Sequence, residues 1–320
     1  MTVTAPPTAS KAPGKIVAKE RLGDRVFSGS ALYSGVAILL ILAAVAFFLV
    51  GQSLPAIVAN PADFSGSPES LLAYVWPLVF GTLWSASLAL LMALPLSIGI
   101  ALFISHYAPR RLAQGLGYVI DLLAAVPSVV YGLWGILVLA PAVQPVYTWM
   151  VNALGFIPLF AGPVSGTGRT ILTAAIVLGV MILPVMTAVC REIFLQTPVL
   201  YEEAALALGA TRWEMIRMAV LPFGRPGIIS GAMLGLGRAL GETMAVAMVL
   251  SPASVVTFAL LQSANPSTIA ANIALSFPEA YGLNVNLLIA TGLILFIITL
   301  IVNSIARFIV NRRKDFSGAN

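Results

Sequence analysis

The side chains that carry most covalent and metal chemistry are nearly absent from this chain. Its 320 residues include one cysteine, Cys190, and one histidine, His106. One cysteine excludes a disulfide within the chain, and the two residues offer neither a metal-ligand cluster nor a Cys/His nucleophile arrangement. No GxxxxGK[ST] segment is present, which is the loop that cradles nucleotide phosphates. We therefore expect neither an enzyme active site nor a metal site in this chain.

Charge is also scarce, at 9% of residues, whereas 59% are hydrophobic and the mean hydropathy is +0.99. Such values are typical of membrane proteins. Six apolar stretches each reach the roughly 20 residues that a membrane-spanning helix needs, at 30–54, 77–104, 116–140, 171–189, 228–250 and 287–308. Nothing alternates with a period of two, as a barrel strand would. We predict an all-α polytopic membrane protein with six transmembrane helices.

Basic residues are distributed unevenly between the segments that join these spans. Of the 17 Lys and Arg residues, 15 lie in the two termini and in the two connections that share their side of the membrane. Arg169 alone falls in an opposite-side loop, and Arg238 lies within a span. The positive-inside rule places both termini in the cytosol. The pI of about 9.6 reflects this bias, and without a basic groove or interleaved aromatics it does not indicate a nucleic-acid partner.

Four segments follow from this layout. Residues 1–28, rich in Pro, Ala, Thr, Lys and Gly, are expected to form a flexible cytosolic tail rather than a cleaved signal. Residues 29–75 should hold the first transmembrane helix and an extracytoplasmic loop. Residues 76–310 should form a core of five transmembrane helices with a cytosolic loop at 191–225, and residues 311–320 a second cytosolic tail.

Arg238 and Glu242 lie inside an apolar run, where ionisable groups are expensive. An Arg at a helix centre costs about 2.5–3.5 kcal/mol on insertion scales, so such a residue is a functional-site hypothesis by default. A spacing of four places both side chains on one helix face, with a structural salt bridge as the alternative interpretation. Gly231 and Gly235 extend that face and predict close packing against another helix.

A second site candidate is the segment 124–135, AAVPSVVYGLWG. Pro127 and two glycines predict a broken helix near the middle of the bilayer, although both residue types are common in membrane helices. The break would allow Ser128 and Tyr131 to offer hydroxyl groups to a polar ligand. Asp121, just before it, is expected in a helix-end or interhelical pair rather than a proton relay.

The loop 191–225 carries a local helix signal. Thr197 can cap a helix, Pro198 suits its first position and Gly209 suits a left-handed stop, so a helix of about 198–208 is expected. It is too short to span a membrane. These features leave open whether it is a plain surface helix or one that docks into a partner's groove.

The spacing of this loop resembles the EAA loop of ABC-importer permeases, although Ala219 stands where that family usually has Ile. The matching positions are Glu203, Ala204, Ala205, Gly209, Leu221 and Pro222. The resemblance implies that Glu203, Ala204, Ala205 and Gly209 couple the chain to an ATP-binding subunit. ATP and Mg²⁺ would then be bound by that partner, and this chain would hold no cofactor.

Two further stretches, AVPSVVYGLWG and GLGRALGETMAV, resemble the PstC-type permease subunit of phosphate-specific ABC importers. The similarity runs from about residue 77 to the end of the last span. It implies a type I importer permease with the MetI-like fold, in a bacterial inner membrane. The partners it implies are a homologous PstA-like permease, two PstB-like ATPases, an extracytoplasmic phosphate-binding protein and the surrounding lipid.

In such a permease, Arg238 would be a waypoint for inorganic phosphate, and Glu242 would hold that guanidinium and limit its affinity. Alternatives are a permease for another oxyanion such as sulfate or molybdate, and a PstA-type subunit. A secondary phosphate transporter would show no EAA loop. A membrane sensor or scaffold would use the cytosolic helix to dock a signalling partner.

Overall fold

The computed structural model describes residues 22–60, 64 and 70–311. Most of the expected tail 1–28 and nearly all of the expected tail 311–320 lie outside these residues. Where the first tail is described it is helical, because α1 runs over Leu22–Val58. The chain forms two compact units, one ending at Phe48 and the other beginning at Leu49. Up to Phe48, α1 exposes apolar side chains on all sides, as a lipid-facing helix does.

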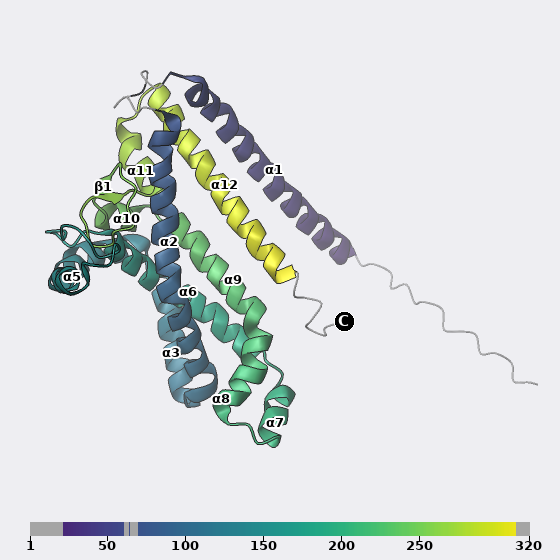
Figure 1. The fold of residues 1–320 in the computed structure, drawn as a ribbon. Helices are drawn as coiled ribbons and strands as arrows, with labels where there is room; N and C mark the ends of the chain where they lie inside the picture. Colours follow the sequence, from purple (N-terminus) through teal and green to yellow (C-terminus); the bar gives the residue numbers. More distant parts are fainter. Residues whose placement is uncertain (1–21, 61–63, 65–69, 312–320) are drawn as a thin grey trace, which may run out of the picture. The chain divides into compact units, whose positions relative to one another are not determined.

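The second unit is a helical bundle built around α6, Ile171–Leu195. Along α6 pack α2, Leu71–Leu102, and α9, Leu221–Leu240 (Figure 1). The end of α2 continues as a π-helical turn, η2, Phe103–Tyr107, and the last helix, α12, covers Leu283–Asn311. Because most of α6 is buried, it forms the centre of the core.

Six helices of the described chain are long and apolar enough to cross a membrane, so the all-α expectation is confirmed. They are Gly23–Val58, Leu71–Tyr107, Ser128–Leu154, Ile171–Leu195, Arg212–Leu240 and Leu283–Ile309. The first, second, fourth and sixth correspond to predicted spans. The third and fifth predicted spans differ from the structure.

A single third span over 116–140 is the wrong prediction, because the chain breaks inside it. The helix α3, Arg110–Ala124, lies beside η2 and α6, and α4 begins only at Ser128. Pro127 has no backbone N–H and disfavours a helical conformation in the residue before it. The helix continues through α4, Ser128–Trp134, a π-helical turn η3, Gly135–Leu139, and α5, Ala140–Leu154. The predicted break in 124–135 is confirmed.

A continuous fifth span over 228–250 is also wrong. The chain rises through α8, Arg212–Met215, a π-helical turn η4, Ile216–Val220, and α9, which ends at Leu240. A separate short helix, α10, then covers Met244–Val249. The interruption matters for the site because it falls between Arg238 and Glu242.

The segment after α10 is anchored on α2. It contains the two-residue strands β1, Pro252–Ala253, and β2, Asn265–Pro266, which pair in parallel, and α11, Ile269–Ser276. The Ile269 N–H donates to Thr82 Oγ1 at 2.9 Å, and Gly81 lies so close to the Ser267 carbonyl that no side chain fits there. Phe258 meets Trp84 edge-on at 5.3 Å. This segment is therefore part of the core rather than a free loop.

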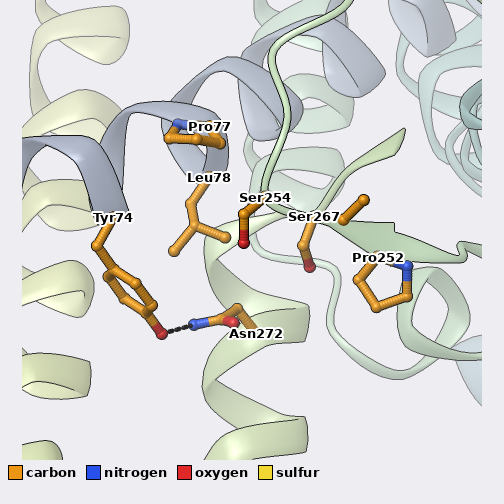
Figure 2. A pocket seen from close by; sticks show the side chains of 8 residues that line it. Tyr74, Pro77, Leu78, Pro252, Ser254, Ser267 and Asn272 are labelled. Atoms are coloured by element: carbon orange, nitrogen blue, oxygen red, sulfur yellow. Dashed lines mark hydrogen bonds between the residues drawn. The ribbon is translucent and has the colours of Figure 1, made fainter. Parts of the chain in front are cut away.

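A small cavity of about 100 Å³ lies where this segment meets α2. Figure 2 shows Tyr74 and Asn272 on one side of it, with the Asn272 amide donating to the Tyr74 hydroxyl at 2.8 Å. Ser254 and Ser267 line the other side. No Arg, Lys, Asp or Glu lines the cavity, so it offers no charged group to bind an ion.

Candidate functional site

Arg238 occupies the last turn of α9 and is half-buried. The carbonyl groups at a helix C-terminus carry a partial negative charge, which stabilises a cation there. Part of the cost of burying this guanidinium is therefore offset by its own helix. Arg238 also lies within electrostatic range of the Tyr131 hydroxyl on α4, so two of the predicted site residues come together.

Glu242 lies beyond the end of α9 and is only 8% exposed. Its carboxylate accepts a hydrogen bond from the Ala245 N–H at 3.0 Å and so caps the start of α10. No ion pair joins it to Arg238 among the described residues. The expectation that both side chains share one face of a continuous helix is wrong, because α9 ends between them.

The opposite end of α10 is held by a second arginine. Arg169 donates through Nη2 to the Leu250 carbonyl at 2.9 Å. A carboxylate at the first turn and a guanidinium at the last both complement the helix dipole. A helix of six residues is too short to be stable alone, so these contacts and its packing determine its position.

The packing of α10 depends on two glycines in α4 and η3. A side-chain carbon on Gly132 would lie 2.7 Å from the Ala245 Cα, and one on Gly135 would lie 2.8 Å from the Val249 Cγ2. The backbone of α4 therefore lies directly against α10. The two interrupted helices, α3–α4 and α9–α10, meet through this contact, and Tyr131, next to Gly132, lies within electrostatic range of Arg238. Broken helices meet in this way at ion sites in transporters.

Tyr131 braces the break between α3 and α4. Its hydroxyl donates to the Leu123 carbonyl at 2.9 Å. In an unbroken helix that carbonyl would accept from residue 127, but Pro127 has no N–H to give. The predicted hydroxyl donor to a ligand is therefore engaged by the backbone in this structure. Ser128, the other predicted hydroxyl, begins α4 and is half-buried.

Gly231 and Gly235 lie buried on the face of α9 that meets α6. Gly231 lies against Cys190, which is fully buried, and a side-chain carbon on Gly235 would lie 2.7 Å from the Met186 sulfur. The close approach that small residues permit is thus directed at α6.

The predicted short helix is confirmed as α7, Val199–Ala207, and Gly209 has the left-handed φ of +88° that was expected of the stop. The start differs from the prediction. Pro198 occupies the cap position, and the Thr197 hydroxyl is buried without a partner instead of capping the helix. Proline has no side-chain acceptor, so the free N–H groups in the first turn of α7 find no side-chain cap at this position.

The EAA residues on α7 divide between two faces. Ala205 is buried in a cluster with the ends of α2 and α6. Glu203, Ala204 and Gly209 are exposed, and beside them Leu208 is 88% exposed. An apolar side chain that protrudes from a short helix is a typical anchor for a partner's groove.

Sequence reasoning missed one contact that ties α7 to the bundle. His106 Nε2 lies 3.3 Å from Glu202 Oε1, and His106 Nδ1 lies 2.6 Å from the Ser105 hydroxyl. The two partners are 96 residues apart in the chain, so no local pattern announces them. The only signal was that His106 is the single histidine.

Known transport proteins are similar to this chain over most of its length. Residues 93–315 match the family of binding-protein-dependent transport system inner membrane components. Phosphate transport system permease protein PstC 2 of Mycobacterium tuberculosis is 44% identical, covering 92% of this chain and 94% of the relative. The PstC protein of Mesorhizobium japonicum is 39% identical over 93% of both chains.

Solved structures support the fold at lower identity. A bacterial ABC transporter chain involved in alginate import is 18% identical, with a TM-score of 0.60 over 92% of this chain and all of that chain. A chain of the inward-facing MetNI methionine transporter is 17% identical, with a TM-score of 0.51 over 76% of this chain and 95% of that chain. With six candidate spans and an EAA helix in the same bundle, this multi-pass membrane protein belongs to the PstC family of phosphate transport system permease proteins.

Proposed function

We propose that this chain forms half of the transmembrane pathway of an ATP-driven importer of inorganic phosphate. The observation that carries the proposal is 44% identity to a phosphate transport permease over 92% of the chain. That match includes both interrupted helices and the EAA helix. No feature of the described residues favours sulfate, molybdate or a secondary transporter.

The pathway passes Arg238, which lies within electrostatic range of Tyr131 on α4, the helix that contacts α10. Phosphate carries one to two negative charges near neutral pH, and a guanidinium can grip two of its oxygens at once. The helix C-terminus and the nearby carboxylate of Glu242 both compete with the anion for this guanidinium. Such competition keeps affinity modest, which a transported ion needs in order to leave.

The conformational change driven by ATP reaches this chain through α7. Its exposed end, with Glu203 and Leu208, faces a PstB-like ATPase on the cytosolic side, where both termini of the chain also lie. Two such ATPases bind ATP and Mg²⁺, whereas this chain binds no cofactor. The His106–Glu202 contact carries movement of α7 to the end of α2. A PstA-like permease completes the pathway, and an extracytoplasmic binding protein delivers phosphate to it.

The test is uptake of labelled phosphate and labelled sulfate by cells that express the complete complex. Arg238→Gln should reduce phosphate uptake more than tenfold at matched membrane levels. Arg307→Gln, which removes an exposed guanidinium near the end of α12, is the matched control. Full phosphate uptake by Arg238→Gln would remove Arg238 from the pathway, and uptake of sulfate in place of phosphate would overturn the substrate.

A further inference from the structure

A second, larger cavity lies away from Arg238, at the end of the bundle that carries α7. It is an open groove of about 470 Å³ between α3, η2 and the last turns of α6. We call it the α3 groove. Its polar lining comprises Arg110, Gln114, Tyr118, Asp121 and Arg191. Because Ser105, on its wall, adjoins the His106 that contacts α7, the groove lies at the coupling end of the chain.

The groove carries an uncompensated positive charge. Arg110 and Arg191 face it with one acid, Asp121, and none of these three side chains has an ion pair or hydrogen bond within the described chain. The guanidinium of Arg191 is half-buried, and its Nε is buried without a partner. Two guanidinium groups that line one open groove without side-chain acceptors leave donors available to an anion from outside the chain.

Packing fixes the position of the Arg191 guanidinium. Gly117, a buried residue of α3, lies directly against it, and a side-chain carbon at that position would collide with Nη1. The glycine therefore makes room for the guanidinium at the floor of the groove. A pre-positioned guanidinium loses less entropy when it binds an anion than a free surface arginine does.

The donors around the groove match a phosphate group. Two guanidinium groups can each bind two phosphate oxygens, and the Gln114 amide and Tyr118 hydroxyl add neutral donors. Ile104 and Leu195 line the same groove, and Leu122, which directly follows Asp121 on α3, is 70% exposed. Basic pockets with apolar walls at the ends of transmembrane helices are where anionic headgroups bind.

We propose that the α3 groove binds a phosphate group at the coupling end of the chain, carried by an anionic phospholipid headgroup or present as free inorganic phosphate. Arg191 grips the phosphate from the floor and Arg110 closes over it from the rim. Occupancy would link α3, η2 and α6, of which η2 contacts α7 through His106 and Glu202. The proposal does not depend on which solute the chain transports.

The lipid arm of the test uses the purified, detergent-solubilised complex with added phosphatidylglycerol, measured by native mass spectrometry. Wild type and Arg307→Gln should retain the lipid, whereas Arg191→Gln and Arg110→Gln should retain at least tenfold less. Arg110 is exposed, so its substitution leaves the packing intact. If Arg191→Gln does not assemble, the lipid retention of Arg110→Gln tests the proposal.

The phosphate arm uses a delipidated complex that carries Arg238→Gln, so that the pathway arginine does not contribute. Inorganic phosphate should raise its thermal midpoint in a saturable way, and adding Arg191→Gln should abolish the rise. A response in either arm supports the proposal and identifies the source of the phosphate. Equal lipid retention and equal phosphate response in all variants would overturn the proposal. It would also be overturned if the arginine variants lost only a co-purifying protein subunit and kept their lipid and phosphate responses.

Discussion

Glu242 combines two properties at the turn between α9 and α10. As a hydrogen-bond acceptor it caps α10 through the Ala245 N–H, and as a buried anion it lies four residues from Arg238. A glutamine keeps an acceptor oxygen but loses the charge, whereas an alanine loses both. The two substitutions therefore separate the structural contribution from the electrostatic one.

We predict that Glu242→Gln assembles normally but imports phosphate about tenfold more slowly, equivalent to ~1.4 kcal/mol, because phosphate leaves an uncompensated Arg238 more slowly. Glu242→Ala should show the same defect and lose a further ~1 kcal/mol of stability with the cap. Uptake kinetics and thermal unfolding of the purified complex measure both. Unchanged uptake by Glu242→Gln would leave the residue with its capping role alone.

At the scale of elements, the contact between α4 and α10 is a backbone contact. Gly132 leaves no space for a methyl group beside Ala245. Close packing of this kind cannot absorb an added carbon without moving one of the helices.

We predict that Gly132→Ala separates α4 from α10 and costs ~1–3 kcal/mol of stability. Most uptake should be lost, because Tyr131, next to Gly132, lies within electrostatic range of Arg238. Gly99→Ala in α2 is the control, since a side-chain carbon there meets nothing within 4 Å and alanine favours a helix. Thermal unfolding in detergent compares the two. Equal stability of both variants would contradict a tight α4–α10 contact.

The short helix α7 provides another element-scale test, because its apolar end is unsupported by the described chain. Leu208→Asp should leave the permease folded but reduce the amount of co-purifying ATPase more than tenfold, since a charge replaces the anchor in the partner's groove. Phe156→Asp, 81% exposed and before α6 instead of after it, is the control. ATPase recovery that is the same in both variants would remove Leu208 from the interface.

At the scale of the whole molecule, α6 connects two loops that we expect on opposite sides of the membrane. Phe156 precedes it and Leu208 follows it, and its 25 residues are long enough to cross the hydrocarbon core. If the distribution of basic residues determines orientation, the Leu208 side is cytosolic and the Phe156 side is external.

We predict that, when the chain is expressed without its ATPase partner, a membrane-impermeant thiol reagent labels Phe156→Cys in intact spheroplasts and labels Leu208→Cys only after permeabilisation. Cys190 is fully buried, so the parent protein gives little background. Labelling of Leu208→Cys in intact spheroplasts would reverse the orientation and, with it, the side on which the ATPase docks.

Local patterns in the sequence were sufficient for the membrane class, for the break in 124–135 and for the α7 helix with its stop at Gly209. Each depends on composition or on residues a few positions apart, since hydrophobic length, a proline and a left-handed glycine act through the backbone beside them. The motif of α7 was recognisable for the same reason, because its residues lie within a few positions of one another.

Only the tertiary structure decided where the fifth span ends and what the charges near it contact. The apolar run that ends at residue 250 predicts one continuous helix. Its interruption depends on the Glu242 cap of α10, on the space that Gly132 leaves for α10, and on the hydrogen bond from Arg169 to the Leu250 carbonyl, 81 residues away. The His106–Glu202 contact and the pairing of Arg191 with Gly117 likewise join separate helices. Contacts between distant segments follow from how whole helices pack, and no spacing along a single helix encodes them.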